Sequence, residues 1–146
     1  MDVKIIESIN QFLGLAAIGD SESLEALRHY EASEFVWRQI LELHPEHVRA
    51  VTLNRTLPDT ILSHLATHES PDVRADIANR RTLPRDLYGI LASDRDEAVR
   101  ARLAWNKKTP VCVLKKLACD PEEIVFKNAR LRLSQLNSEP AWEVPN

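Results

Sequence analysis

The chain has little glycine, little cysteine and few aromatic residues, and each shortage argues against a class of structure. Three glycines exclude a glycine-rich phosphate loop and are few for a sheet joined by glycine turns, whereas eight prolines favour short helices separated by proline. The two cysteines, Cys112 and Cys119, do not make a disulfide framework. Because seven residues of helix separate their alpha carbons by about 10 Å, they cannot bond to each other along an intact helix. We expect free thiols that fill the core.

Other classes of protein are excluded by patterns that the sequence lacks. No apolar run approaches the ~20 residues that span a bilayer, and the N-terminus lacks the pattern of a signal peptide. We therefore expect a cytoplasmic protein without a membrane partner. The net charge of −3 does not indicate a nucleic-acid or membrane partner. Without a nucleophile elbow, a dinucleotide fingerprint or clustered carboxylates, the chain is predicted to be no enzyme and to hold no cofactor.

Five histidines invite the hypothesis of a metal site. His44 and His47 are three residues apart, and His64 and His68 are four apart, a spacing at which two helical histidines can share an ion. No cluster of cysteine or aspartate supplies further ligands, and no glutamate stands beside His64 as in a metalloprotease helix. The sequence therefore predicts surface or turn histidines and no metal site.

A repeat of 26 residues runs through the second half of the chain, from Asn54 to Arg130. Several apolar and proline positions recur at this step. They are Pro58, Pro84 and Pro110; Leu65, Leu91 and Leu117, each followed by alanine; and Val73, Val99 and Val125. A fixed period of this size is typical of stacked supersecondary units. The repeat therefore predicts an all-α solenoid, without a sheet, in which the three leucines are buried in equivalent places.

Each repeat is predicted to hold two helices of two to three turns. A threonine before the proline (Thr56, Thr82 and Thr109) is expected to cap the first helix, whose apolar residues include the pair Ile90 and Leu91. The second helix begins at a polar break such as Asp120-Pro121-Glu122-Glu123. Helices this short are marginal alone, so they must be held by stacking on their neighbours.

The predicted boundaries give one repeat domain over residues 1–136 and a tail over 137–146. Within the domain we expect N-terminal capping helices over 1–32, with Leu24 and Leu27 inward, and a degenerate repeat over 33–53. Clear repeats follow over 54–79, 80–105 and 106–136, the last with a C-terminal cap. The tail has two prolines and no period, and it is expected to be loose or to lie on the surface with Trp142 as an anchor.

These motifs, taken together, resemble the leucine-rich repeat variant family. The matching pattern is T-x-P or T-P, then L-x-x-L-A, then D-P or S-P, then V-R-x-x-[IL]-A, best from Asn54 to Ala118. The resemblance implies a right-handed superhelix of short helices related to the HEAT and armadillo solenoids. It implies a scaffold with no shared chemistry. One member of that family holds an iron–sulfur centre on an N-terminal cysteine cluster, but this chain has no cysteine before Cys112.

Arginine follows the repeated valine at Arg49, Arg74 and Arg100. In solenoids of this kind such an arginine pairs with an acid of the neighbouring turn. The candidate partners are Asp72, Asp94, Asp96 and Asp120. We favour a structural ladder of ion pairs over a ligand site for this column.

A second basic column lies in the links between repeats, at Arg55, Arg81 and Lys107, with Arg80 and Lys108 beside it. Trp105 stands just before and adds either a stacking surface or core packing. The column is either simply solvated or meets an acidic partner. The function expected is a non-catalytic scaffold that binds an unidentified protein or peptide, with acidic character if the column is used. The alternative is a nucleic-acid-binding helical-repeat protein that uses the same column.

Overall fold

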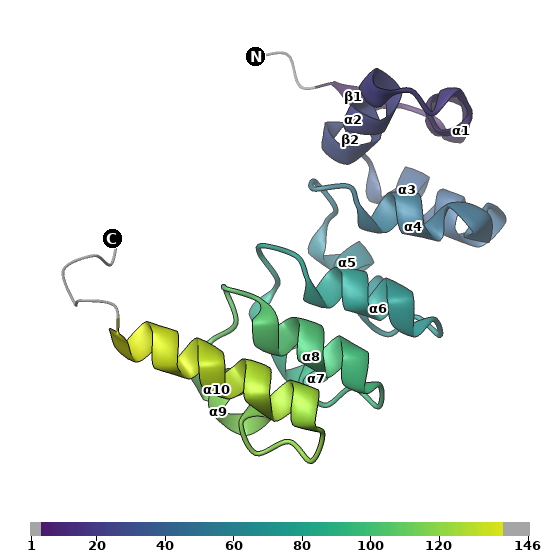
Figure 1. Ribbon diagram of the computed structural model, residues 1–146. Helices are drawn as coiled ribbons and strands as arrows, with labels where there is room; N and C mark the ends of the chain where they lie inside the picture. Colours follow the sequence, from purple (N-terminus) through teal and green to yellow (C-terminus); the bar gives the residue numbers. More distant parts are fainter. Residues whose placement is uncertain (1–3, 139–146) are drawn as a thin grey trace. The chain divides into compact units, whose positions relative to one another are not determined.

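The computed structural model describes residues 4–138, and the chain divides into two compact units, Met1–Thr67 and His68–Asn146 (Figure 1). Ten α-helices, one 3-10 helix and two short strands lie within the described residues. The predicted helical character is confirmed. The predicted tail lies largely outside the described residues, Trp142 included, although the last helix runs on through Ser138.

The first unit combines six helices with a minimal two-stranded sheet. Its elements are β1 (Ile5–Ile6), α1 (Ile9–Ile18), α2 (Ser21–His29), β2 (Glu31–Ala32), α3 (Glu34–Leu43), the 3-10 helix η1 (Pro45–His47), α4 (Val48–Thr52) and α5 (Asp59–Ala66). β1 and β2 pair in parallel, with Ile5 opposite Glu31 and Ile6 opposite Ala32.

This pairing contradicts the prediction of a fold without a sheet. Ser8 caps α1 by accepting a hydrogen bond from the Gln11 N–H at 3.3 Å, so the helix begins only at Ile9. The β-branched residues before the cap are left extended, and Ile6 is fully buried. The predicted inward side chain of Leu24 is also wrong, because Leu24 is exposed while Leu27 is buried.

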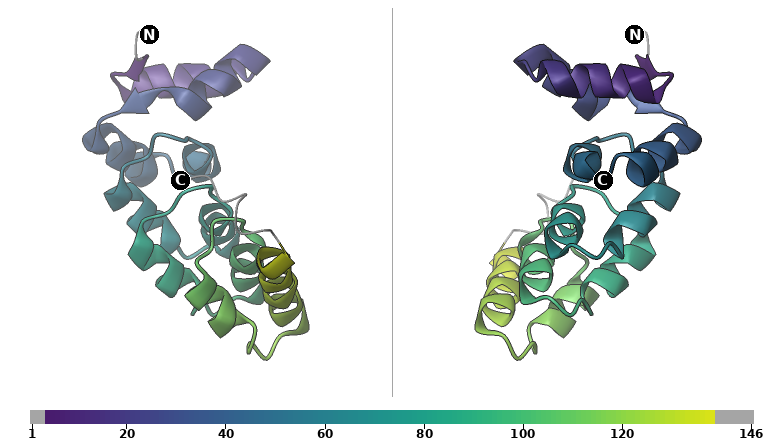
Figure 2. Two further views of the ribbon diagram at one scale, coloured as in Figure 1. Left: turned by 90° about the vertical axis from the view of Figure 1, so that its left-hand side faces the viewer. Right: turned by 90° about the vertical axis from the view of Figure 1, so that its right-hand side faces the viewer.

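The second unit is built from five helices in two layers (Figures 1 and 2). They are α6 (Pro71–Ala78), α7 (Arg85–Leu91), α8 (Glu97–Trp105), α9 (Val111–Leu117) and α10 (Glu123–Ser138). α8 packs between α6 and α10, and the shorter α7 and α9 lie on the other layer against them. The α6–α7 and α8–α9 links therefore emerge at the same end of neighbouring helices.

The predicted leucine column forms part of the core. Leu65, Leu91 and Leu117 are each buried, which confirms the predicted phase of the repeat. The prediction fails one residue earlier, because Ile90 is 45% exposed on α7. Leu87 is buried, as the repeat predicts, and Tyr88 is buried in place of Ile90, so Leu87, Tyr88 and Leu91 form the apolar face of α7.

Two further expectations about side chains are wrong. Cys112 and Cys119 are free thiols, as expected, but both are exposed, so neither fills the core. The threonines also do not cap the first helices. The capping positions are the prolines, without a side-chain bond, while Thr109 donates its hydroxyl to the Leu103 carbonyl at 2.7 Å. Thr109 thus closes the end of the preceding helix α8 and does not cap α9.

Candidate functional site

Asn106 fixes the α8–α9 link in place and so prepares the candidate site. Its side-chain amide donates to the carbonyls of Ala78 and Arg80 at 2.8 and 2.7 Å, and its oxygen accepts from the Lys108 N–H at 2.9 Å. The side chain is buried, so these bonds are shielded from water. Asn106 therefore ties one link to the end of the neighbouring helix.

Asn54, two periods earlier, makes the same arrangement in the first unit. Its amide donates to the carbonyls of Leu27 and Tyr30, and its oxygen accepts from the Thr56 N–H. Arg80 stands at the intermediate repeat position, half-buried, and burial lowers its pKa. Asn54 and Asn106 lie two periods apart, a recurrence that is visible in the sequence but is not part of a charged column.

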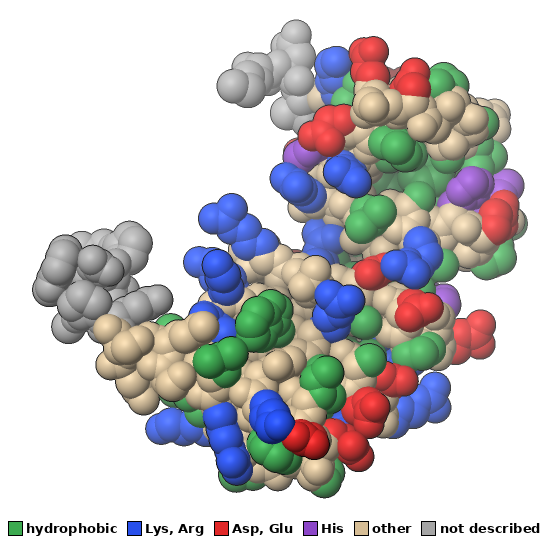
Figure 3. Space-filling view, viewed as in Figure 1, with side chains coloured by type: hydrophobic (Ala, Val, Ile, Leu, Met, Phe, Trp, Pro, Cys, Tyr) green, Lys and Arg blue, Asp and Glu red, His purple; other side chains and the backbone are tan. Residues whose placement is uncertain are grey.

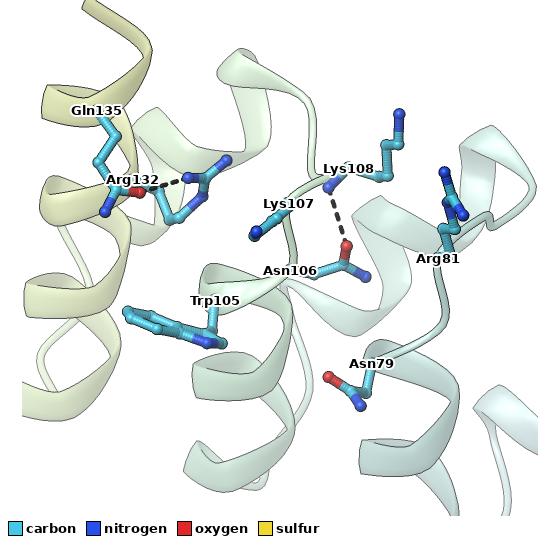
Figure 4. A pocket seen from close by; sticks show the side chains of 8 residues that line it. All are labelled: Asn79, Arg81, Trp105, Asn106, Lys107, Lys108, Arg132 and Gln135. Atoms are coloured by element: carbon cyan, nitrogen blue, oxygen red, sulfur yellow. Dashed lines mark hydrogen bonds between the residues drawn. The ribbon is translucent and has the colours of Figure 1, made fainter. Parts of the chain in front are cut away.

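Beside Asn106 the second unit is hollowed to a volume of about 650 Å³ (Figure 4). We call this feature the Trp105 hollow. It is lined by Asn79, Arg81, Trp105, Asn106, Lys107, Lys108, Arg132 and Gln135. The lining comes from the ends of α6 and α8, the links that follow them, and one face of α10. Of the predicted partner-binding residues, the structure brings together Arg81, Trp105, Lys107 and Lys108.

All the charged residues that line the Trp105 hollow are cationic. Arg81, Lys107, Lys108 and Arg132 line it, and no carboxylate stands among its lining residues. Arg81, Lys107 and Lys108 are exposed, and within residues 4–138 no carboxylate forms an ion pair with them. Arg132 donates to the side-chain oxygen of Gln135 (Figure 4). A cluster of cations not neutralised by neighbouring acids produces a positive potential at this surface.

Trp105 supplies the large apolar surface of the hollow. It is the last residue of α8, and its side chain is 52% exposed. In Figure 4 the indole reaches toward α10, on the same side of the hollow as Lys107 and Arg132. Of the two roles left open by the sequence, core packing therefore does not describe this residue.

The overall negative charge conceals a basic second unit. Residues 68–138 contain 14 Lys and Arg against 10 Asp and Glu, a formal charge of +4. Figure 3 shows Lys and Arg gathered around the links that follow α6 and α8. In the second unit, most acidic side chains lie near the N-terminal ends of α6, α8 and α10. Helix dipoles account for part of this separation, because acids are favourable at helix N-termini and cations at C-termini. Helix dipoles alone do not explain why four cationic residues line the same hollow.

The arginines that follow the repeated valine form ion pairs on the opposite end of the same helices. Arg74 donates from Nε and Nη2 to the carboxylate of Asp94 at 2.7 and 3.0 Å, and both side chains are only 6% exposed. Its Nη1 donates to the carbonyls of His68 and Glu69. A bidentate, buried pair of this kind supports the structural interpretation of Arg74 over a ligand site.

Arg100 repeats this geometry one period later. It binds the carboxylate of Asp120 through Nε at 2.8 Å and Nη2 at 3.1 Å, and it donates to the Asp94 carbonyl at 2.7 Å. The pairing lowers the pKa of Asp120 and raises that of Arg100. Asp94 and Asp120 are two of the four acids that the sequence offered as partners.

The remaining members of the predicted columns lie in the first unit. Arg55 and Arg49 are exposed there, and the backbone N–H of Arg55 donates to the Arg28 carbonyl at 2.8 Å. Asp94 and Asp120 are one period apart, and the position one period before Asp94 is occupied by His68 instead of an aspartate. Its Nδ1 accepts from the Ser70 N–H, as Asp94 does from Asp96 and Asp120 from Glu122.

Arg132, Gln135 and Asn79 are lining residues that sequence reasoning missed. Arg132 and Gln135 stand three residues apart on α10, one turn of helix, and so share a face. They belong to the long last helix, outside the repeated pattern, so no column indicated them. Only the packing of α10 on α8 brings them to the hollow.

Neither metal chemistry nor a membrane span has support in the described residues. Among residues 4–138, no three His, Cys, Asp or Glu side chains group closely enough to hold a metal ion. His44 and His47 both lie near Glu46, at 3.1 and 3.9 Å. No helix within the same residues has the length and apolar character needed to cross a bilayer.

Comparison with known proteins found no protein-family model, no curated protein and no solved structure that matches the chain.

Proposed function

We propose that the chain is a non-catalytic scaffold that binds an acidic protein or peptide through the Trp105 hollow. In this proposal the helices form a right-handed solenoid of two-helix repeats, similar to the leucine-rich repeat variant proteins. The side-by-side packing of α6, α8 and α10, with α7 and α9 on the other layer, supports that arrangement. Buried residues at one period, such as Leu91 and Leu117, support it as well.

The proposal rests on one observation, which is that the charged residues lining the hollow are all cationic. Four cationic residues line it, and its lining includes no acid. Like charges gathered at a surface repel one another, although screening at physiological salt, over about 8 Å, keeps that cost modest. An acidic partner would neutralise them, and the steering of such a partner depends on salt.

The test compares two double substitutions that change the net charge equally. Arg81→Glu with Lys107→Glu reverses the hollow, whereas Arg95→Glu with Lys115→Glu reverses two exposed cations outside its lining. Binding of a fluorescein-labelled oligoglutamate is measured by anisotropy at low and physiological salt. We expect the first variant to lose at least about tenfold in affinity and the second to stay near wild type. Equal losses, or no binding by the wild type at low salt, would contradict the proposal.

Nucleic acid is the second candidate, and the exposed indole of Trp105 is the observation that favours it. Bases stack on aromatic side chains while cations follow the phosphates, without a need for sequence recognition. A labelled single-stranded oligonucleotide is therefore measured beside oligoglutamate with the same variants. Tighter binding of the oligonucleotide, lost only on reversal of the hollow, would favour this candidate instead.

A further inference from the structure

The Trp105 hollow offers two kinds of contact, and together they specify more than negative charge. One side holds the indole of Trp105 with Lys107, Arg132 and Gln135 around it (Figure 4). The other side holds Arg81 and Lys108, which project from neighbouring links, with Asn79 below them (Figure 4). Asn106 lies between the two sides and holds the α8–α9 link through its buried amide.

We infer that the hollow recognises a short acidic peptide segment with an aromatic side chain between two carboxylates. This inference rests on the proposed function and names the partner of that same site. The aromatic side chain packs on the exposed indole of Trp105. One carboxylate meets Lys107 and Arg132, and the other meets Lys108 and Arg81.

The exposed indole is the argument for an aromatic residue. Trp105 is 52% exposed, and within residues 4–138 no aromatic ring or cation stacks against its face. Aromatic pairs packed edge to face or offset gain stability beyond the area that they bury. Tryptophan and arginine are also the residue types that most often dominate binding at interfaces. An aliphatic or polar side chain would leave this part of the hollow less well filled.

The restrained side chain of Arg132 favours a fixed position for one of the two carboxylates. One of its five N–H groups is engaged by the side chain of Gln135, which limits the rotation of the guanidinium. Its Nε is buried without a hydrogen-bond partner among the described residues, so the side chain lies against the protein over part of its length. A guanidinium held in this way presents its charge at one place, which favours a carboxylate at a set position.

The spacing of the two carboxylates follows from the packing of the helices. α6 and α8 pack side by side, and packed helices lie 8–10 Å apart. The Arg81–Lys108 pair lies between the links that follow α6 and α8, and the Lys107–Arg132 pair lies between the α8 link and α10, which packs on the other side of α8. The two carboxylate positions are therefore about one helix spacing apart. An extended peptide advances about 3.3 Å per residue, so acids about three residues apart cover this distance. The segment expected is therefore acid, aromatic, any residue, acid, in extended conformation.

Charge favours a short acidic segment over a nucleic acid. Residues 1–67 contain 10 Asp and Glu against 5 Lys and Arg, and the whole chain carries −3. The negative net charge of the chain disfavours a long polyanion, whereas a peptide with two or three carboxylates can be neutralised by the cations of the hollow alone. The amides of Asn79 and Gln135 can also bond the peptide backbone, which a nucleic acid lacks.

The experiment uses two fluorescein-labelled peptides of equal charge, Gly-Ser-Glu-Phe-Ser-Glu-Ser-Gly and the same peptide with serine for phenylalanine. Anisotropy gives the affinity of the full chain for each. We expect the phenylalanine peptide to bind at least about tenfold more tightly. Trp105→Ala should remove this preference but keep the salt-dependent binding of both peptides, and Trp105→Phe should restore part of the preference.

Ile124→Ala serves as the control, because Ile124 is an exposed apolar residue outside the hollow, and it should leave the preference unchanged. Circular dichroism checks that each variant is folded. Equal binding of the two peptides, both lost on charge reversal of Arg81 and Lys107, would overturn this inference and leave the proposed function standing. No binding of either peptide would overturn both. Tighter binding of single-stranded DNA, lost with Trp105→Ala, would replace the peptide by a nucleic acid.

Discussion

At the scale of single residues, the repeated aspartates do two tasks at once. Asp120 holds Arg100 with both carboxylate oxygens and also accepts from the Glu122 N–H just before α10. Asp94 does the same for Arg74 and the Asp96 N–H. Each aspartate thus both orders the turn before a helix and joins that helix to its neighbour in the same layer, α8 to α6 and α10 to α8. Arg74 and Arg100 therefore serve a structural role, in contrast to the arginines and lysines of the Trp105 hollow.

The first prediction at this scale concerns Asp120 and pH. The hydrogen bonds from Arg100 hold the pKa of Asp120 below its ordinary value of 3.8, so the unfolded chain takes up the proton first as pH falls. The stabilisation is therefore complete above the ordinary value and is lost as pH falls through the lower, folded value. Asp120→Asn should cost about 1–3 kcal/mol at pH 7. It should also lose less additional stability than wild type between pH 5 and pH 3.

Urea unfolding followed by circular dichroism at the two pH values measures this difference. Asp86→Asn is the control, because Asp86 is exposed on α7 and forms no ion pair within the described residues. It should behave as wild type at both pH values. If Asp120→Asn lost as much stability on acidification as wild type, the pair would not be responsible for acid sensitivity.

At the scale of elements, each helix depends on one buried face. The helices of the second unit before α10 have seven to nine residues, lengths at which isolated helices are marginal in water. Their stability must come from packing, and two neighbouring residues of α7 show how local that packing is. Leu91 is fully buried, whereas Ile90, one position earlier, is 45% exposed.

We therefore predict very different costs for Leu91→Ala and Ile90→Ala. The first opens a cavity in the core and should reduce the free energy of unfolding by about 2–5 kcal/mol. The second removes an exposed side chain and should change it by no more than about 0.5 kcal/mol. Urea unfolding of both variants measures the contrast. Similar costs for the two would mean that the face of α7 is assigned wrongly.

At the scale of the whole molecule, acidic residues predominate in the first unit and basic residues in the described part of the second. The net charge of −3 combines an acidic first unit with a basic described part of the second. Within residues 4–138, the histidines that suggested a metal are not joined by enough further ligands to form a metal site. His44 and His47 have ring centroids 6.3 Å apart, and their carboxylate neighbour is the exposed Glu46.

The prediction at this scale is that the purified chain carries no stoichiometric metal. Two histidines and one exposed carboxylate do not complete the four ligands of a structural zinc site. Elemental analysis after dialysis should find much less than one zinc or iron per chain. One bound metal per chain that is lost on His44→Ala would contradict this prediction and assign the site.

Patterns within the sequence were enough to predict the helical class, the 26-residue period and the burial of the three repeated leucines. These follow from local rules, because apolar spacing and helix-breaking residues act within one or two turns. It also supplied the candidate acids for Arg74 and Arg100, since a pairing partner must recur at the same period. The solenoid, its handedness and the family stay predictions.

Which of the repeated residues contact one another depends on the tertiary structure. Cys112 and Cys119 are both exposed, because Cys112 lies on a side of α9 that nothing within the described residues packs against and Cys119 follows the end of that helix. Ile5 and Ile6 find a partner strand 26 residues later, a pairing between distant segments that no local pattern specifies. The Trp105 hollow depends on α10, whose Arg132 and Gln135 follow no column. Contacts between residues far apart in sequence arise from packing, so they became visible only when the helices were placed together.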